Sequence, residues 1–284
     1  MRRNRSSICR FAMILFAVLV STASSSRAQT PAPSPSPPSL EKEFFKNILE
    51  DQKAIWTAPL SLHRADAKWM IPAGVGAMAL FTTDRITGDE IAESNEQVRA
   101  SQFTSHVGSV YGISTVAAAF YLVGRKTNNA RARETGILTA EAFIDSLIVS
   151  GALKGITQRA RPEAGRERSE FFDGGNSFPS GHSTQVWAAA TVIANEYHDK
   201  KLVQVAAYGI ASAVSVARVT EHKHYISDVV IGSAVGFAIG QYVYRAHHRE
   251  PSDLTPPETT QSRWPTIVPH YNRHAYGVGL TWSF

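Results

Sequence analysis

The chain has 284 residues, one cysteine and a formal net charge of +5 at pH 7, and 43% of its residues are hydrophobic. Its first 28 residues hold five arginines and no acidic residue, so the remainder is close to neutral. The overall charge therefore gives no support to a nucleic-acid partner. The single cysteine, Cys9, excludes an intramolecular disulfide.

The N-terminus has the pattern of an export signal. Arginines precede an apolar run over 11–20, and Ser26-Arg27-Ala28 is a suitable cleavage sequence. We therefore predict a signal peptide over 1–28, with an uncleaved signal anchor as the alternative, and a Pro/Ser-rich linker over 29–39. The expected location is the inner membrane, with the site facing the periplasm, or the periplasm itself.

A helical domain is predicted over 40–250. Its first part, 40–62, has an amphipathic pattern with a turn near Pro59, and would either lie on a membrane surface or pack on the helical body. The domain is rich in Ala, Gly, Val and Ile, and its apolar runs predict an all-α bundle of about six core helices. These helices are expected over 68–81, 107–124, 138–154, 183–197, 202–218 and 226–244.

Some of these helices are candidates to cross a membrane. Residues 107–124 carry no charged side chain and are long enough to be a transmembrane candidate. The mean hydropathy of −0.15 argues against a densely embedded chain, whereas the apolar pair around 202–244 argues for one. Glu141 and Asp145, four residues apart, are interpreted as a polar helix face or as partners of Lys154 or nearby arginines.

A first motif consists of Lys154, six further residues, and Arg161-Pro162. Seven residues are two helical turns, so a helix would place both cations on one face, and Pro162 is expected to end that helix. Two fixed cations suit a phosphoryl group, whose transfer depends on positioning and charge stabilisation. The following loop, 163–178, is the expected place for substrate selectivity, because it holds Phe171, Phe172, Asn176 and Phe178.

The second motif is Pro179-Ser180-Gly181-His182. Pro179 suits the first position of a helix, Gly181 allows close backbone approach, and the free amides of a helix start favour an anion. His182 lies in the first turn, within reach of a bound group. An ordinary helix cap with an incidental histidine is the alternative.

The third motif is Arg218, then His224, then Asp228. On a helix, His224 and Asp228 would lie on neighbouring turns of one face. A carboxylate that accepts from one imidazole nitrogen leaves the other free to attack, which predicts His224 as a nucleophile. Asp228 could equally serve as a charge at a helix start. His222 is expected to point elsewhere, at the rim or surface.

The C-terminus forms a separate part. Residues 251–265 are a second linker, and 266–284 form a strand-like tail whose end, 277–284, alternates apolar and small or polar residues. A single strand cannot make a barrel, so we expect an edge strand that docks on a partner or back on this chain.

Together, the three motifs resemble those of the type 2 phosphatidic acid phosphatase superfamily, which also includes bacterial acid phosphatases and vanadium haloperoxidases. The family pattern is K-x6-RP, PSGH and SR-x5-H-x3-D. Here Ala217 replaces the serine before the last arginine. The resemblance implies a helical bundle with the phosphate pocket at one end, His224 as nucleophile, Asp228 as its orienting carboxylate and His182 as proton donor. The phosphate-binding residues that it implies are Lys154, Arg161, Ser180, Gly181 and Arg218.

The resemblance implies a phosphatase that forms a phosphohistidine and acts on a phosphate monoester or pyrophosphate, with a membrane lipid as the expected substrate. We expect no metal or other cofactor, because three cations and a helix start supply the charge stabilisation. The expected partners are a phosphorylated lipid or a small phosphate ester and a membrane. The sequence indicates neither nucleic acid nor a particular protein partner. A nonspecific periplasmic acid phosphatase, a vanadium haloperoxidase and a non-catalytic anion-binding protein are the alternatives.

Overall fold

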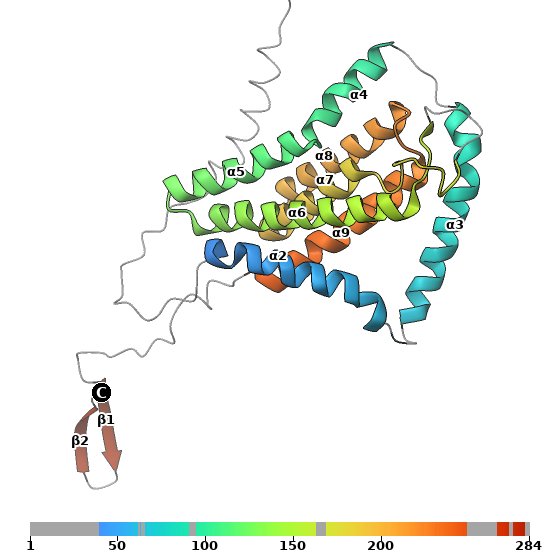
Figure 1. The fold of residues 1–284 in the computed structure, drawn as a ribbon. Coiled ribbons are helices and arrows are strands. Elements are labelled where there is room, and N and C mark those ends of the chain that lie inside the picture. Colours follow the sequence, from blue (N-terminus) through green and yellow to red (C-terminus); the bar gives the residue numbers. More distant parts are fainter. Residues whose placement is uncertain are drawn as a thin grey trace, which may run out of the picture. The chain divides into compact units, whose positions relative to one another are not determined.

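The computed structural model describes residues 40–61, 63, 66–90, 95–162, 169–248, 266–272 and 275–281. The predicted signal peptide (1–28) and the linkers (29–39 and 251–265) lie outside these residues. Within the described part, residues 40–248 contain eight α-helices and one short 3-10 helix (Figure 1). They are α2 (Leu40–Thr57), η1 (Ala58–Ser61), α3 (Ala67–Glu90), α4 (Asn95–Val107), α5 (Val110–Lys126), α6 (Ala130–Thr157), α7 (Gly181–Glu196), α8 (Lys201–Thr220) and α9 (Ile226–His247).

The expected all-α bundle is therefore confirmed for this domain, but two of its elements differ from the prediction. α3 continues to Glu90 rather than ending near residue 81. α4 was not predicted, because its sequence, NEQVRASQFTSHV, lacks an apolar run. Ser109 begins α5 by accepting a hydrogen bond from the Gly112 amide, which separates α4 from α5.

Two strands are described in the tail. Strands β1 (Thr266–Asn272) and β2 (Ala275–Thr281) pair antiparallel, with Thr266 opposite Thr281 and Asn272 opposite Ala275. The alternation over 277–284 thus belongs largely to one strand of a hairpin, whose partner strand is supplied by the same tail.

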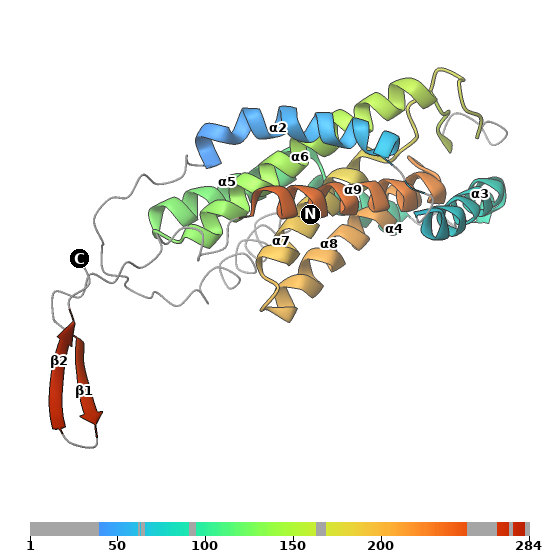
Figure 2. The ribbon, with the colours of Figure 1, turned by 90° about the horizontal axis from the view of Figure 1, so that it is seen from below.

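Helix α2 packs against α6, as Figures 1 and 2 show, so the second of the two predictions for this segment is the correct one. The Asn47 amide donates to Glu141 Oε1 (3.1 Å), and the Gln52 amide donates to Asp145 Oδ1 (2.8 Å). Both carboxylates are fully buried. Their interpretation as a polar face or as partners of Lys154 and the arginines is wrong: these acids join α6 to α2.

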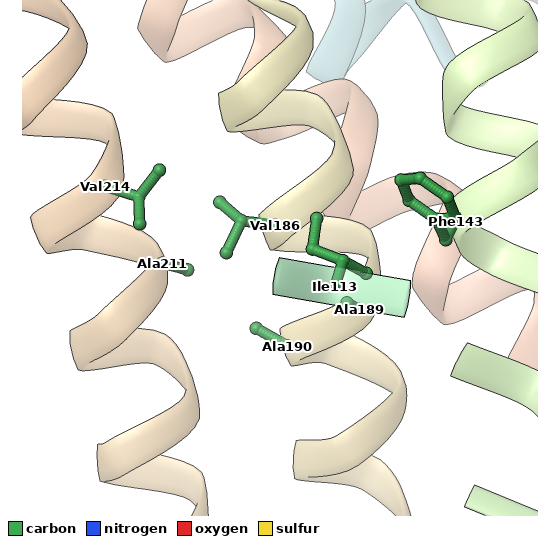
Figure 3. Close-up of a cluster of buried hydrophobic side chains, with 7 residues drawn as sticks. All are labelled: Ile113, Phe143, Val186, Ala189, Ala190, Ala211 and Val214. Carbon is green, nitrogen blue, oxygen red and sulfur yellow. The ribbon is translucent and has the colours of Figure 1, made fainter. Parts of the chain in front are cut away.

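Helix α7 lies at the centre of the bundle and contacts α6, α8 and α9. Its short apolar side chains allow neighbouring helices to interdigitate with it. Figure 3 shows one cluster in which Val186 and Ala190 of α7 meet Val214 of α8, with Ile113 of α5 and Phe143 of α6 beside them. The bundle core is therefore built around the helix that begins at the PSGH motif.

Glycines of α9 bring it close to α7. A Cβ at Gly232 would lie 2.9 Å from the Ser180 carbonyl oxygen, one at Gly236 would lie 2.1 Å from that of Thr184, and one at Gly240 would lie 2.4 Å from that of Ala188. The four-residue spacing places all three on one face of α9. This close approach holds the start of α9 against the PSGH turn.

We expect Gly236→Ala to lower the free energy of unfolding by about 1–3 kcal/mol, because the added methyl group overlaps the α7 backbone. Thermal unfolding of the full chain in detergent measures this. Gly209→Ala on α8 is the matched control, since a Cβ there has no atom within 4 Å, and it should be neutral or slightly stabilising. Equal melting temperatures for the two variants would contradict the packing argument.

Three of the described helices, α6, α8 and α9, are long and apolar enough to cross a membrane. The bent pair Arg99–Val107 and Val110–Lys126, with an angle of 43° between its halves, would make a fourth span if it counts as one. Residues 107–124, predicted as one span, are thus divided between two helices, because α4 ends at Val107 and α5 begins at Val110. α5 is long enough to cross a membrane only if it is counted together with α4.

Candidate active site

The three motifs meet where four helices end or begin. Lys154 lies in the last turn of α6, Gly181 begins α7, Arg218 lies in the last turn of α8, and Asp228 lies in the first turn of α9. A Cβ at Gly181 would lie 3.6 Å from Lys154 Cε, and the Ser180 amide donates to the Asp228 carbonyl (3.0 Å). The motif residues, which are far apart in the sequence, thus lie close together at one end of the bundle, where the pocket was expected.

Lys154 and Arg161 converge by a different route from the one predicted. α6 ends at Thr157, because Gln158 adopts a left-handed conformation (φ 45°) and its amide donates to the Lys154 carbonyl. The prediction of one helix face for both cations is therefore wrong. Instead, Lys154 Nζ donates to the Asn176 carbonyl (2.5 Å) and Arg161 Nε donates to the Asn176 side-chain oxygen (2.7 Å). Asn176 holds both cations in one place.

The PSGH motif forms the start of α7. Ser180 is the N-cap residue and its side chain makes no capping hydrogen bond, while Pro179 precedes the cap rather than occupying the first helical position. The first amides of a helix have no acceptor within it and lie at the positive end of the helix dipole. The turn beside Lys154 therefore has the character of an anion site.

Arg218 is buried against α4, the helix that the sequence did not predict. Its Nη1 donates to Glu221 Oε2 (2.6 Å) and to Ser105 Oγ (3.2 Å), and Ser105 Oγ donates to Glu221 Oε1 (2.6 Å). This pairing fixes the guanidinium, which would share its charge between Glu221 and a bound anion.

His224 lies just before α9, not on it, and is 3% exposed. Its Nδ1 is 3.7 Å from Asp228 Oδ2 and 3.5 Å from Ser177 Oγ. With Nδ1 facing these two groups, Nε2 is the atom left for attack. Asp228 Oδ2 also accepts from the Tyr225 amide (3.0 Å) and the Ser177 hydroxyl (2.5 Å), so both explanations of Asp228 hold: it caps the helix start and faces the histidine.

Behind Asp228 lies a buried ion network that the sequence did not reveal. Arg159 Nη1 donates to Asp228 Oδ1 (2.6 Å) and to Ser227 Oγ (2.7 Å), and its Nη2 donates to Asp84 Oδ2 (2.7 Å). Asp84 in turn accepts from the Ser227 amide (3.1 Å). Arg159, Asp84 and Asp228 are each at most 1% exposed. A chain of contacts thus runs from α3 through Arg159 to Asp228 and His224.

Aromatic rings surround the Arg159 guanidinium. Its carbon lies 4.4 Å from the Tyr225 ring centroid, 5.0 Å from that of Phe171 and 5.1 Å from that of Phe81. Phe178 also packs on Phe81 and Phe171. In the described part of the loop, 169–178, Phe171 and Phe178 therefore support Arg159, whereas Phe172 is 76% exposed. Substrate selectivity by this loop stays a prediction.

The two histidines are held neutral at pH 7. Burial lowers the pKa of His182 to about 4, and the positive charges of Arg218, Lys154 and Arg161 add to the effect, as does that of His224 when it is protonated. Burial also lowers the pKa of His224 to about 4, with Asp228 opposing this and Lys154 and Arg218 adding to it.

A pH dependence of stability follows. The unfolded chain binds a proton at each histidine below about pH 6.5, whereas the folded chain resists protonation of His224 down to about pH 4, so stability should fall as the pH drops through this interval. The loss from His224 is on the order of 1–3 kcal/mol. Melting temperatures in detergent between pH 4.5 and 7.5 test this: His224→Asn should flatten the curve, and an unchanged slope would contradict the assignment.

Part of the chain is similar to known proteins. Residues 135–252 match the model of the PAP2 superfamily. A lipid A 1-phosphatase from Porphyromonas gingivalis is 39% identical over 70 residues, which are 24% of this chain and 16% of that protein. A PA-phosphatase related-family protein from Dictyostelium discoideum is 26% identical over 147 residues, 45% of this chain and 54% of that protein. The chain thus spans about half or less of these curated relatives.

A solved structure of a transmembrane PAP2 type phosphatidylglycerolphosphate phosphatase from Bacillus subtilis is also similar. It has a TM-score of 0.44 and 19% identity, covering 72% of this chain and 94% of that one. The segment 135–252, which matches the PAP2 superfamily, contains the three cations, both histidines and Asp228.

Proposed function

We propose that this protein is a metal-independent phosphatase that hydrolyses a phosphate monoester or pyrophosphate of a membrane lipid through a phosphohistidine. The observation that carries the proposal is the buried His224, whose Nδ1 faces Asp228 and Ser177. The charges of Lys154 and Arg218 act on this histidine, and those of Lys154, Arg161 and Arg218 act on His182. These cations and the amides at the start of α7 would hold the phosphoryl oxygens and stabilise the charge that they carry in transfer.

In the first step, His224 Nε2 attacks phosphorus, and the bond from phosphorus to the leaving oxygen breaks. His182 donates a proton to that oxygen, so a neutral alcohol departs. In the empty pocket His182 is neutral, because burial and neighbouring cations lower its pKa. A bound phosphate dianion offsets those positive charges, so substrate binding favours the protonated form that the step needs.

In the second step, water attacks the phosphorus of the phosphohistidine. His182, left neutral by the first step, accepts a proton from this water, and the bond between phosphorus and Nε2 breaks. Inorganic phosphate leaves and His224 is restored. The Nδ1 contacts with Asp228 and Ser177 hold the ring orientation throughout both steps.

A lipid substrate is supported by the surface of the helices. α8, one of the candidate spans, exposes Leu202, Val205 and Val216 to 60% or more. Exposed apolar side chains on a helix of this length suit contact with acyl chains. We infer that the helices cross the inner membrane and that the pocket faces the periplasm, an orientation that fits the predicted signal peptide; a periplasmic location is the alternative.

The test is phosphate release by the full chain in detergent, with and without chelator. The panel contains phosphatidate, phosphatidylglycerol phosphate, a lipid A 1-phosphate, undecaprenyl pyrophosphate and a soluble aryl phosphate. We expect release from a lipid, unaffected by chelator. A preference for the aryl phosphate would favour a nonspecific acid phosphatase. Loss of activity in chelator with recovery in magnesium would refute the metal-independent mechanism, and a folded protein that hydrolyses nothing would favour anion binding or peroxidase chemistry.

A further inference from the structure

A second cluster of ionisable side chains lies far from the phosphate pocket on three of the same helices. It consists of Glu134 near the start of α6, Glu196 at the end of α7 and His248 directly after α9. Along α7, His182 and Glu196 are separated by about 20 Å, and along α9 the distance from Asp228 to His248 is about 30 Å, at 1.5 Å per residue. The cluster is therefore independent of the phosphoryl chemistry.

The ligand atoms converge on one point. His248 Nδ1 lies 3.1 Å from Glu196 Oε1 and 3.2 Å from Glu134 Oε1, and one atom from each of the three residues lies within 4.8 Å of the other two. A single N–H shared between two carboxylate oxygens gives only a bent, bifurcated hydrogen bond to each. Ligands about 2.0–2.1 Å from a tetrahedral zinc ion are roughly 3.3 Å apart, which matches these separations.

The surroundings hold the three side chains in place. The side chains of Glu196 and Glu134 are 1% and 11% exposed, and that of His248 is 19% exposed. The Tyr244 ring stacks on the His248 ring at 4.5 Å and 19°. Arg131 Nε donates to the Glu196 carbonyl (2.7 Å) and its Nη2 pairs with Asp199, while its charge also acts on the Glu196 carboxylate.

We propose that Glu134, Glu196 and His248 form a binding site for a divalent transition-metal cation, of which Zn²⁺ is the representative. Two carboxylates and one imidazole are a donor set for such ions, and water would complete the coordination. The charge of the cation balances two buried carboxylates, and it lies beside the ends of α7 and α9, where helix carbonyls favour positive charge. The bound ion joins α6, α7 and α9 at the end away from the phosphate pocket and stabilises the bundle.

The experiment is calorimetric titration of the chelator-treated, untagged full chain in detergent with Zn²⁺. We expect one ion per chain, and a melting temperature that rises with Zn²⁺ concentration. Glu196→Gln and Glu134→Gln should each weaken binding by about 100-fold or more, since each removes a ligand. His247→Gln is the matched control, because this neighbouring histidine pairs with Asp51 instead (2.8 Å) and its loss should leave Zn²⁺ affinity unchanged.

A spectroscopic measurement on the wild-type chain tests the site even if the variants fail to fold. Co²⁺ bound by the wild-type chain should give visible ligand-field bands of a site with nitrogen and oxygen ligands, and Zn²⁺ should displace it. His224→Ala should retain full Zn²⁺ binding, which separates this site from the proposed phosphatase function. No stoichiometric binding by the wild type, or binding that survives Glu196→Gln unchanged, would show that the cluster is a hydrogen-bonded set of side chains and would overturn the proposal.

Discussion

Replacing His224 with alanine is expected to lower phosphate release from the preferred substrate by about 10³-fold or more, because the nucleophile is removed and the remaining groups can only bind and polarise the ester. The pocket around it should stay intact, since the Asp228 carboxylate keeps its bonds from Arg159, Ser177 and the Tyr225 amide. Initial rates with the lipid panel measure the loss.

Two companion variants make this result specific. His222→Asn is the control: this histidine lies two residues away in the same loop, its φ of 54° is one that asparagine tolerates, and activity should remain near wild type. His182→Ala, supplied with an aryl phosphate whose leaving group needs no proton, should accumulate phosphoenzyme, because the water attack lacks its base. An acid-labile, alkali-stable phosphoryl group should form there and never in His224→Ala. Full activity in His224→Ala would refute the covalent mechanism.

Replacing Arg159 with methionine is expected to destabilise the protein by about 3–5 kcal/mol, because removal of one partner of a buried ion pair leaves the others uncompensated. Asp84 and Asp228 would then be buried without the guanidinium that bonds to both. Phosphate release should fall as well, since Asp228 would lose one of the contacts that place it behind His224. Thermal unfolding and initial rates of the same preparations measure both effects.

The charge argument can be separated from the loss of packing. The double variant Arg159→Met with Asp84→Asn removes one of the two orphaned charges and should regain part of the stability. Arg159→Lys should remain impaired, because a single ammonium cannot reproduce the fork that reaches Asp84 and Asp228. Arg125→Met, which loses an exposed bond to Tyr121, is the control and should change stability by less than about 0.5 kcal/mol. A wild-type melting temperature for Arg159→Met would contradict the proposed role of the network.

The sequence by itself was sufficient to predict the helical fold class and to name the candidate residues of the pocket. Apolar runs of helical length predicted most core helices, since burial of such runs depends on local spacing. The roles proposed for Lys154, His182 and His224 followed from residue type and motif spacing. Motif spacing predicts which residues lie together when each motif lies at the end of a helix. α4 was missed because its polar sequence lacks that signal, although it supplies Ser105 beside Arg218.

The tertiary structure decided how the motifs are supported. Gln158 ends α6 four residues before Pro162, so the position of Arg161 depends on Asn176, which no helical periodicity could indicate. Arg159 is one of several arginines in a basic stretch, and its burial depends on Asp84, 75 residues earlier in the chain. Contacts between residues so far apart arise from the packing of whole helices. The residues proposed to do the chemistry were therefore readable from short motifs, whereas those that hold them became evident only from the fold.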